Sequence, residues 1–300
     1  MKKFVFILSI FSINFCFAQF EDKDIEINKY VHGTLCISTE ETDIAAVIIP
    51  GSGPADRDGN SPAFNNHCLE MLAHGLAKNN IASFRYDRRL LRLKELQITT
   101  ANLSFDDFIE DAITAVNYLE NSLNYKKIVV IGHSQGSLVG MIVAKDRASG
   151  FISIAGPANK ISEKIAVQLS KKSPELANTT RAKFKELRET DTIKQIEPFL
   201  TGIFRPSFLQ FLKSWDQYDP KEEIQKLDIP ILIVTGTKDM QISPKDAEEL
   251  KAMVSNAELL LLENMTHILK YDTETRKNEE GELVLHPDLV PALTKFIQEL

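Results

Sequence analysis

A serine stands between two glycines where an apolar segment gives way to a helical pattern. In Gly132-His133-Ser134-Gln135-Gly136, the glycines suit a sharp turn between a strand and a helix, because a side chain at either position would collide with the neighbouring element. Such a turn exposes the hydroxyl of Ser134. A serine hydroxyl is a poor nucleophile at neutral pH, so it needs a base beside it and backbone N–H groups facing the developing oxyanion. The N–H of Gln135 is one candidate donor.

An acid and a base follow later apolar segments of the chain. Asp239 comes just after Ile231 to Val234, and His267 comes just after Leu259 to Leu262. Because the carboxyl ends of parallel strands meet at one edge of a sheet, we expect both side chains to reach Ser134. The three residues therefore predict nucleophilic catalysis, with His267 as the base and Asp239 holding its imidazole.

Two other histidines are weaker candidates for chemistry at this site. His286 precedes Pro287 in the final segment and does not follow a strand, so it is the weaker candidate. His133, next to the nucleophile, is expected to pack beneath the turn.

Alternating apolar patterns predict the elements that position these residues. Ile25 to Ser38 indicates an antiparallel edge hairpin. Six further strands alternate with helices, which predicts an α/β fold with a doubly wound, mostly parallel sheet. The strands are expected at Ile44–Pro50, Ile81–Tyr86, Ile128–Ile131, Phe151–Ala155, Pro230–Gly236 and Glu258–Glu263, and the helices over 69–76, 105–116, after Gly136, after Ser243 and after Pro287.

Residues 157–223 interrupt the alternation of strands and helices. The segment is charged and helical in pattern and contains no good strand. It is expected to form a helical lid insertion within a domain spanning residues 19–300. Phe208, Phe211 and Trp215 share one helical face, and two interpretations stay open: they form the core of the lid, or they roof an acyl pocket.

Two longer motifs carry a family resemblance. Gly51 to Asn60 reads Gly-Ser-Gly-Pro-Ala-Asp-Arg-Asp-Gly-Asn, and Arg85 to Arg89 reads Arg-Tyr-Asp-Arg-Arg. The chain resembles an α/β-hydrolase, and over most of its length it is similar to a bacterial serine esterase subgroup with a Gly-Ser-Gly-Pro-x-Asp-Arg-Asp-Gly-Asn loop and an Arg-Tyr-Asp-Lys-Arg segment. The resemblance implies that the N–H of Ser52 joins that of Gln135 in the oxyanion hole. The second motif departs from the pattern at Arg88, where lysine is usual, and no glycine follows Arg89.

The resemblance and the three site residues together imply a serine carboxylic ester hydrolase. It would act on small or medium acyl esters through an acyl-enzyme intermediate. An acyltransferase, a thioesterase or a peptidase for small peptides would use the same residues, and a non-catalytic binding protein is a further alternative. Asp56, Arg57 and Asp58 could touch the substrate or form a charge-paired loop that stiffens the turn.

Composition narrows the partners and cofactors. The 300 residues include 35 basic and 42 acidic side chains, and an acidic balance disfavours nucleic acid and anionic membranes, leaving a small-molecule ester as the expected partner. No His-Glu-x-x-His or cysteine-pair spacing for a metal occurs, so no metal or cofactor is expected. Cys36 and Cys68 could pair in an oxidising compartment, although two buried thiols are the favoured interpretation.

The first 18 residues are typical of a secretory signal. Lys2 and Lys3 precede an apolar stretch from Phe4 to Phe17, and small residues occupy the positions that a signal peptidase inspects. Cleavage after Ala18 would leave a secreted or periplasmic protein that begins at Gln19 and carries no membrane segment. A lipidated Cys16 and an uncleaved anchor are the weaker alternatives.

Overall fold

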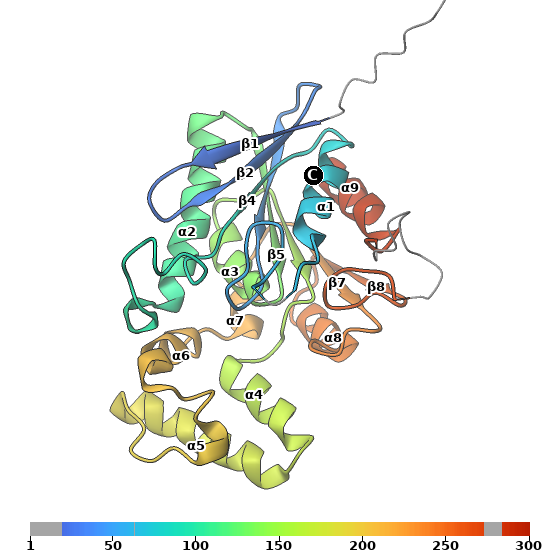
Figure 1. Ribbon diagram of the computed structural model, residues 1–300. Coiled ribbons are helices and arrows are strands. Elements are labelled where there is room, and N and C mark those ends of the chain that lie inside the picture. The colour runs from blue at the N-terminus through green and yellow to red at the C-terminus, as the bar shows by residue number, and fades with distance from the viewer. Residues whose placement is uncertain (1–19, 63, 273–283) are drawn as a thin grey trace, which may run out of the picture.

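The computed structural model describes residues 20–62, 64–272 and 284–300 of the chain (Figure 1). The expected signal segment, residues 1–18, and the new N-terminus at residue 19 lie outside the described residues. Within the described ranges, no helix combines the length and the apolar character needed to cross a bilayer.

An eight-stranded sheet forms the centre of the molecule, with strand order β1-β2-β4-β3-β5-β6-β7-β8. The first two strands are an antiparallel hairpin, β2 pairs antiparallel with β4, and the remaining neighbours are parallel. The predicted doubly wound, mostly parallel α/β fold is thus confirmed. The strands are β1 Phe20–Glu26, β2 His32–Ser38, β3 Ile44–Ile49, β4 Ala82–Tyr86, β5 Lys127–His133, β6 Gly150–Ile154, β7 Ile231–Gly236 and β8 Ala257–Leu262.

The hairpin starts earlier than its apolar pattern predicted. Phe20 to Asp24 pairs with β2 although aspartate is a poor strand residue. The carboxylate of Asp22 lies 3.0 Å from the guanidinium of Arg85, and that of Asp24 lies 2.5 Å from Arg57. These pairings with distant arginines compensate for the low strand propensity of the segment.

Helices cover both faces of the sheet. Helices α1 and α9 pack on one face and α2, α3 and α8 on the other, each over a continuous apolar core (Figure 1). Ser104 caps α2 and forms a capping box with Asp107. The helices are α1 Cys68–Ala77, α2 Phe105–Asn117, α3 Gln135–Ala144, α8 Pro244–Ala252 and α9 Leu289–Gln298.

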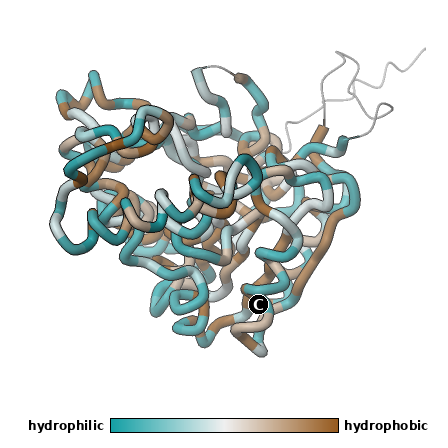
Figure 2. Tube along the Cα trace, turned by 90° about the horizontal axis from the view of Figure 1, so that it is seen from below, coloured by the Kyte–Doolittle hydropathy of each residue, from teal (hydrophilic) through white to brown (hydrophobic). Residues whose placement is uncertain are grey.

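The segment between β6 and β7 consists of helices and connecting loops without a strand, and it lies below the carboxyl ends of the strands in Figure 1. Seen from that side, hydrophobic and hydrophilic residues alternate along the trace, as in amphipathic helices (Figure 2). These helices enclose a small core of their own. That core contains Phe184, Leu187, Leu200 and Phe204. The helices are α4 Ile161–Ser170, α5 Pro174–Thr190, α6 Leu209–Trp215 and α7 Pro220–Ile224.

Strand register brings four loops to one edge of the sheet. Ile49 pairs with Gly132, and His133 pairs with Ile154. Gly236 pairs with Leu262. The loops that leave β3, β5, β7 and β8 therefore start side by side, and these loops carry Ser52, Ser134, Asp239 and His267.

Candidate active site

Ser134 occupies a strained turn between β5 and α3. Its backbone has φ 53° and ψ −119°, a conformation that residues other than glycine rarely adopt. A Cβ atom at Gly132 would lie 2.3 Å from the carbonyl oxygen of Gly136, and one at Gly136 would lie 2.4 Å from that of Ile49. The predicted reason for both glycines is confirmed: the strand and the helix approach too closely for a side chain.

The structure brings Ser134, His267 and Asp239 together. The Nε2 atom of His267 lies 3.1 Å from the Ser134 Oγ, and its Nδ1 lies 2.7 Å from Oδ2 of Asp239. A carboxylate can only accept a hydrogen bond, so Nδ1 carries the imidazole proton. Nε2 is then the acceptor for the serine hydroxyl proton, which is the geometry that general-base activation requires.

Asp239 is held by its own loop. Its Oδ1 accepts hydrogen bonds from the N–H groups of Gln241 at 2.7 Å and Ile242 at 2.8 Å. The side chain is fully buried, while that of His267 is 12% exposed. The carboxylate is thus fixed on the imidazole, and the histidine keeps contact with the surface from which a substrate would enter.

His133 has a further role that the sequence did not reveal. Its Nε2 donates a 2.8 Å hydrogen bond to the backbone carbonyl of His267, so it ties the loop after β8 to the turn after β5. Burial, followed by the nearby His267, lowers the pKa of His133 to about 4, so its imidazole is neutral at neutral pH. The prediction that it packs at the turn is right but incomplete. No sequence signal specifies a contact between residues so far apart.

Two backbone N–H groups beside Ser134 are free to bind an anion. Ser52 and Gln135 line the same cavity as Ser134. Within the described part of the chain, neither N–H donates a hydrogen bond. Unpaired donors next to a nucleophile are what an oxyanion hole consists of.

The cavity next to Ser134 has a volume of about 200 Å³. Its apolar lining includes Leu138, Ile161, Trp215 and Ile242. A larger hollow of about 470 Å³ adjoins it and shares Lys164, whose ammonium group is paired with Asp246 at 2.9 Å. The cavity at Ser134 therefore combines apolar and polar residues, and charged side chains gather around the wider hollow beside it.

The structure supports the pocket interpretation for Trp215 alone among Phe208, Phe211 and Trp215, and Phe211 belongs to the main core and not to the separate core of the insertion. Trp215 lines the cavity and stacks on Phe105, with ring centroids 5.7 Å apart. Phe211 packs against Phe105 and Phe108 in the main core, and Phe208 stacks on Phe211. Only Trp215 lies where it could contact a substrate.

The charged residues of the loop after β3 form hydrogen bonds and ion pairs with other residues of the protein. Asp56 accepts hydrogen bonds from the N–H groups of Asp58 and Asn60. Arg57 pairs with Asp87 at 2.6 Å, and Asp58 pairs with Arg85 at 2.9 Å. None of the three lines the cavity at Ser134. These contacts favour the structural interpretation, in which the charges stiffen the loop.

Residues considered for other chemistry lie elsewhere. His286 is buried and its Nε2 donates to the carbonyl of Glu263 at 3.0 Å, so it is not paired with Ser134. Cys36 and Cys68 are buried free thiols, and burial raises the pKa of each. The expected buried thiols are thus observed, and the alternative disulfide is wrong.

Two groups of side chains have atoms close enough to share a metal ion. One consists of Asp22, Cys36 and His74, and the other of Asp58, His67 and Glu70. In both, one carboxylate is already paired with Arg85, which a cation would have to displace. Neither group includes a residue of the serine site.

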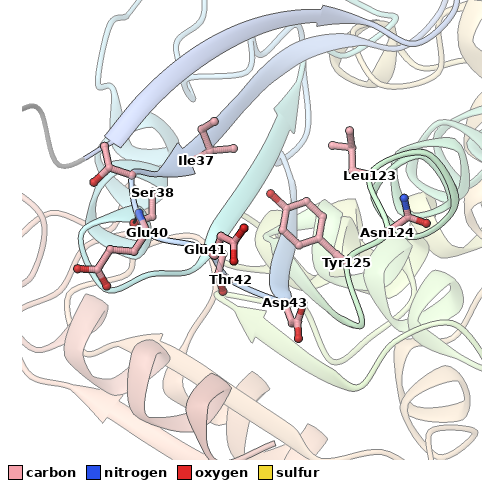
Figure 3. A pocket seen from close by; sticks show the side chains of 10 residues that line it. Ile37, Ser38, Glu40, Glu41, Thr42, Asp43, Leu123, Asn124 and Tyr125 are labelled. Carbon is pink, nitrogen blue, oxygen red and sulfur yellow. Dashed lines mark hydrogen bonds between the residues drawn. The ribbon is translucent and has the colours of Figure 1, made fainter.

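A separate hollow of about 660 Å³ lies at the opposite edge of the sheet, where β3 and β5 begin. Glu40, Glu41 and Asp43 lie around it together with Tyr125 (Figure 3). No histidine is among its described lining residues, so it lacks the base that a serine or threonine nucleophile would need.

Comparison with known families gives the geometry a context. The sequence model of the serine aminopeptidase S33 family, a family of α/β-hydrolases, matches residues 64–274. The chain belongs to this family. In this S33 family member the matched range contains Ser134, Asp239 and His267, whereas the loop with Ser52 precedes it.

One relative is an esterase by name. The S33 family member is 28% identical over 257 residues to the esterase EstD of Thermotoga maritima, an alignment that covers 84% of this chain and 60% of EstD. The chain thus spans about three fifths of the length of that relative.

Solved structures share the fold of this S33 family member. Est1E from Butyrivibrio proteoclasticus superposes with a TM-score of 0.57 at 15% identity, covering 93% of this chain and 96% of that chain. The Pyrococcus furiosus esterase PF2001 gives a TM-score of 0.57 at 15% identity, covering 98% and 95%. At this identity the likeness establishes the α/β-hydrolase fold.

Proposed function

We propose that the protein is a serine ester hydrolase that cleaves short acyl esters through an acyl-enzyme on Ser134. The observation that carries the proposal is the continuous hydrogen-bonded relay from Ser134 through His267 to Asp239, next to two unpaired N–H groups. Membership of a hydrolase family and the similarity to EstD support the reaction class.

The reaction follows from these positions in two steps. Nε2 of His267 takes the Ser134 proton as Oγ attacks the ester carbonyl, and the N–H groups of Ser52 and Gln135 bind the resulting oxyanion. The imidazolium then gives its proton to the departing alcohol, leaving an acyl-serine. Water, deprotonated by the same imidazole, releases the acid and restores the serine. Asp239 stabilises the imidazolium throughout.

The size of the cavity supports a short acyl group. Its volume of about 200 Å³ is smaller than the roughly 300 to 1,000 Å³ typical of pockets for drug-sized ligands. The larger hollow beside it would face the alcohol.

An aminopeptidase activity, which the family name suggests, is less well supported. An aminopeptidase needs an anionic group to hold the substrate's α-ammonium. Among the described residues that line the cavity at Ser134, Lys164 is the charged one and none is a carboxylate. The carboxylates around the adjoining hollow are already paired with basic side chains: Glu163 with Arg181, Asp239 with His267, Asp246 with Lys164 and Glu249 with Lys221.

Steady-state kinetics on matched substrates tests the proposal. The purified protein should hydrolyse p-nitrophenyl acetate and butyrate faster than the octanoate, and faster than alanine p-nitroanilide or a butyryl thioester. Ser134→Ala should abolish ester cleavage. Equal ester hydrolysis by both proteins would refute the proposal, and a preference for the anilide or the thioester would replace it with a peptidase or a thioesterase.

A further inference from the structure

Arg88 is a buried cation directed at backbone carbonyls. It is 4% exposed, and its guanidinium carbon lies 4.1 Å from the centroid of the Phe108 ring. Its Nη1 donates to the carbonyl oxygen of Gly51 at 2.5 Å and to that of Pro50 at 3.3 Å. Within the described ranges no carboxylate lies within ion-pair distance of Arg88, in contrast to Arg57, Arg85 and Arg89.

The Gly51 carbonyl belongs to the same peptide group as the Ser52 N–H. The described backbone contains no cis peptide bond, so the two point in opposite directions. An arginine that holds the carbonyl on one side therefore aims the N–H to the other side. The loop runs against the nucleophile there, because a Cβ atom at Gly51 would lie 3.3 Å from the Cβ of Ser134. Ser52 itself lines the cavity with Ser134.

A second contact holds the two segments together. The Arg88 backbone N–H donates to the carbonyl of Ala55 at 3.3 Å, and Asp87 accepts from the Arg57 N–H at 2.9 Å. The loop after β3 is thus fixed to the segment after β4 beyond Ser52 by these bonds, and before Ser52 by the bonds of the Arg88 side chain. Among the described residues, Arg88 is the one whose side chain forms a hydrogen bond with the peptide group that carries the candidate oxyanion donor.

We infer, on the basis of the proposed function, that Arg88 is a positioning residue of the oxyanion hole. It orients the Gly51–Ser52 peptide toward the reacting carbonyl. Its charge also polarises that peptide, because a hydrogen bond accepted by the carbonyl strengthens the N–H as a donor. Arg88 acts only through this peptide and does not touch the substrate.

Arg88 keeps its positive charge at neutral pH. Burial lowers the pKa of Arg88 to about 10, so the guanidinium is protonated at neutral pH. A neutral side chain of similar size would fill the same space without providing the charge. Lysine, which the similar bacterial serine esterases have at this position, keeps the charge but lacks the planar guanidinium group with its paired N–H donors.

Two substitutions at Arg88 separate charge from packing, and a neighbouring arginine provides the control. Arg88→Met fills the space without a donor, and Arg88→Lys restores the charge. Arg92 is 8% exposed, lies in the same segment, pairs with the exposed Glu95 and donates to the carbonyl of Tyr30 at 3.2 Å, and neither contact has a relation to the site. Arg92→Met is therefore the matched control.

The measurements are kcat and KM for p-nitrophenyl butyrate and the affinity for a trifluoromethyl ketone, which forms a tetrahedral oxyanion on the serine. Arg88→Met should lower kcat by about a hundredfold with little change in KM, as when an oxyanion donor is lost. It should weaken ketone binding by a similar factor. Arg88→Lys should recover most of both losses, and Arg92→Met should resemble the wild type.

The outcomes separate the inference from the proposed function. An inactive wild-type enzyme would overturn both. An active wild type with Arg88→Met equal to Arg92→Met, or with ketone affinity unchanged in Arg88→Met, would overturn the inference alone. If Arg88→Met does not fold, Arg88→Gln provides the neutral variant under the same criteria.

Discussion

At the scale of single residues, the site depends on which nitrogen of the His267 imidazole carries the proton. Asp239 holds Nδ1–H of His267, and that bond leaves Nε2 free to accept the proton of Ser134. The imidazole of His133 holds His267 in place by donating a hydrogen bond to the His267 backbone carbonyl. Asp239 thus sets the tautomer of the base, and the neutral His133 sets its position.

Asp239→Asn tests the first of these contacts. The amide would present an N–H to the imidazole and favour the wrong tautomer, so kcat should fall by about 10⁴-fold, as in other serine hydrolases. The fold should survive, because Asn can still accept from the N–H groups of Gln241 and Ile242. Ester kinetics and circular dichroism check this. Retention of wild-type kcat would contradict the assigned role of Asp239.

His133 predicts a dependence of stability on pH. Its pKa is about 4 in the folded protein and near 6.5 in an unfolded chain. The unfolded state binds more protons between these values, so this contribution to stability is complete above pH 6.5 and is lost as the pH falls to 4. The loss is on the order of 3 kcal/mol in the free energy of unfolding.

His133→Gln is the matched variant for that measurement, because its amide can still donate to the His267 carbonyl but does not titrate. Urea unfolding at pH 7, 5.5 and 4.5 should give a shallower pH dependence for the variant than for the wild type. Identical slopes would show that His133 does not titrate as expected.

At the scale of elements, the turn from β5 into α3 sets the nucleophile. The helix begins so close to the end of β3 that Gly136 would need to move if it carried a side chain. The strained φ of Ser134 is maintained by this close packing and by its N–H, which donates to the Ile154 carbonyl at 2.9 Å.

Gly136→Ala should therefore disturb both stability and chemistry. The added methyl group would lie 2.4 Å from the Ile49 oxygen, so we expect a loss of about 1–3 kcal/mol in the free energy of unfolding. A displaced Ser134 should lower kcat by about a hundredfold. Gly202→Ala is the control, since no atom lies within 4 Å of a Cβ there. Equal behaviour of the two variants would contradict the steric account.

At the scale of the whole molecule, much of the architecture could be predicted from the sequence. Buried parallel strands are continuous apolar segments, and their carboxyl ends converge by topology, which is why Ser134, Asp239 and His267 could be chosen together. The contacts that refine the site could not be predicted. Arg88 reaching Gly51 and His133 reaching His267 depend on loop paths that no local periodicity encodes.

The charged beginning of β1 could not be predicted from the sequence for a related reason. Aspartates in a strand are disfavoured locally, and their stabilising partners, Arg85 and Arg57, follow them by more than thirty residues. The signal that could have identified Arg88 is its departure from lysine within an otherwise matching motif.

The insertion between β6 and β7 supplies one wall of the site, which predicts an effect on chain length. Trp215→Leu should enlarge the cavity and raise the ratio of kcat/KM for octanoyl over butyryl esters by about tenfold. Phe199→Leu, in the same insertion but 57% exposed, should leave the ratio unchanged. An unaltered ratio in Trp215→Leu would show that Trp215 does not contact the acyl group.

Covalent labelling with a fluorophosphonate, followed by intact mass and peptide mapping, tests the activation of Ser134 most directly. The reagent reacts with serines that have a base and an oxyanion hole. We predict a single adduct on Ser134, absent from Ser134→Ala and much slower to form in Asp239→Asn. A folded wild-type protein that forms no adduct, or forms it at another residue, would contradict the account.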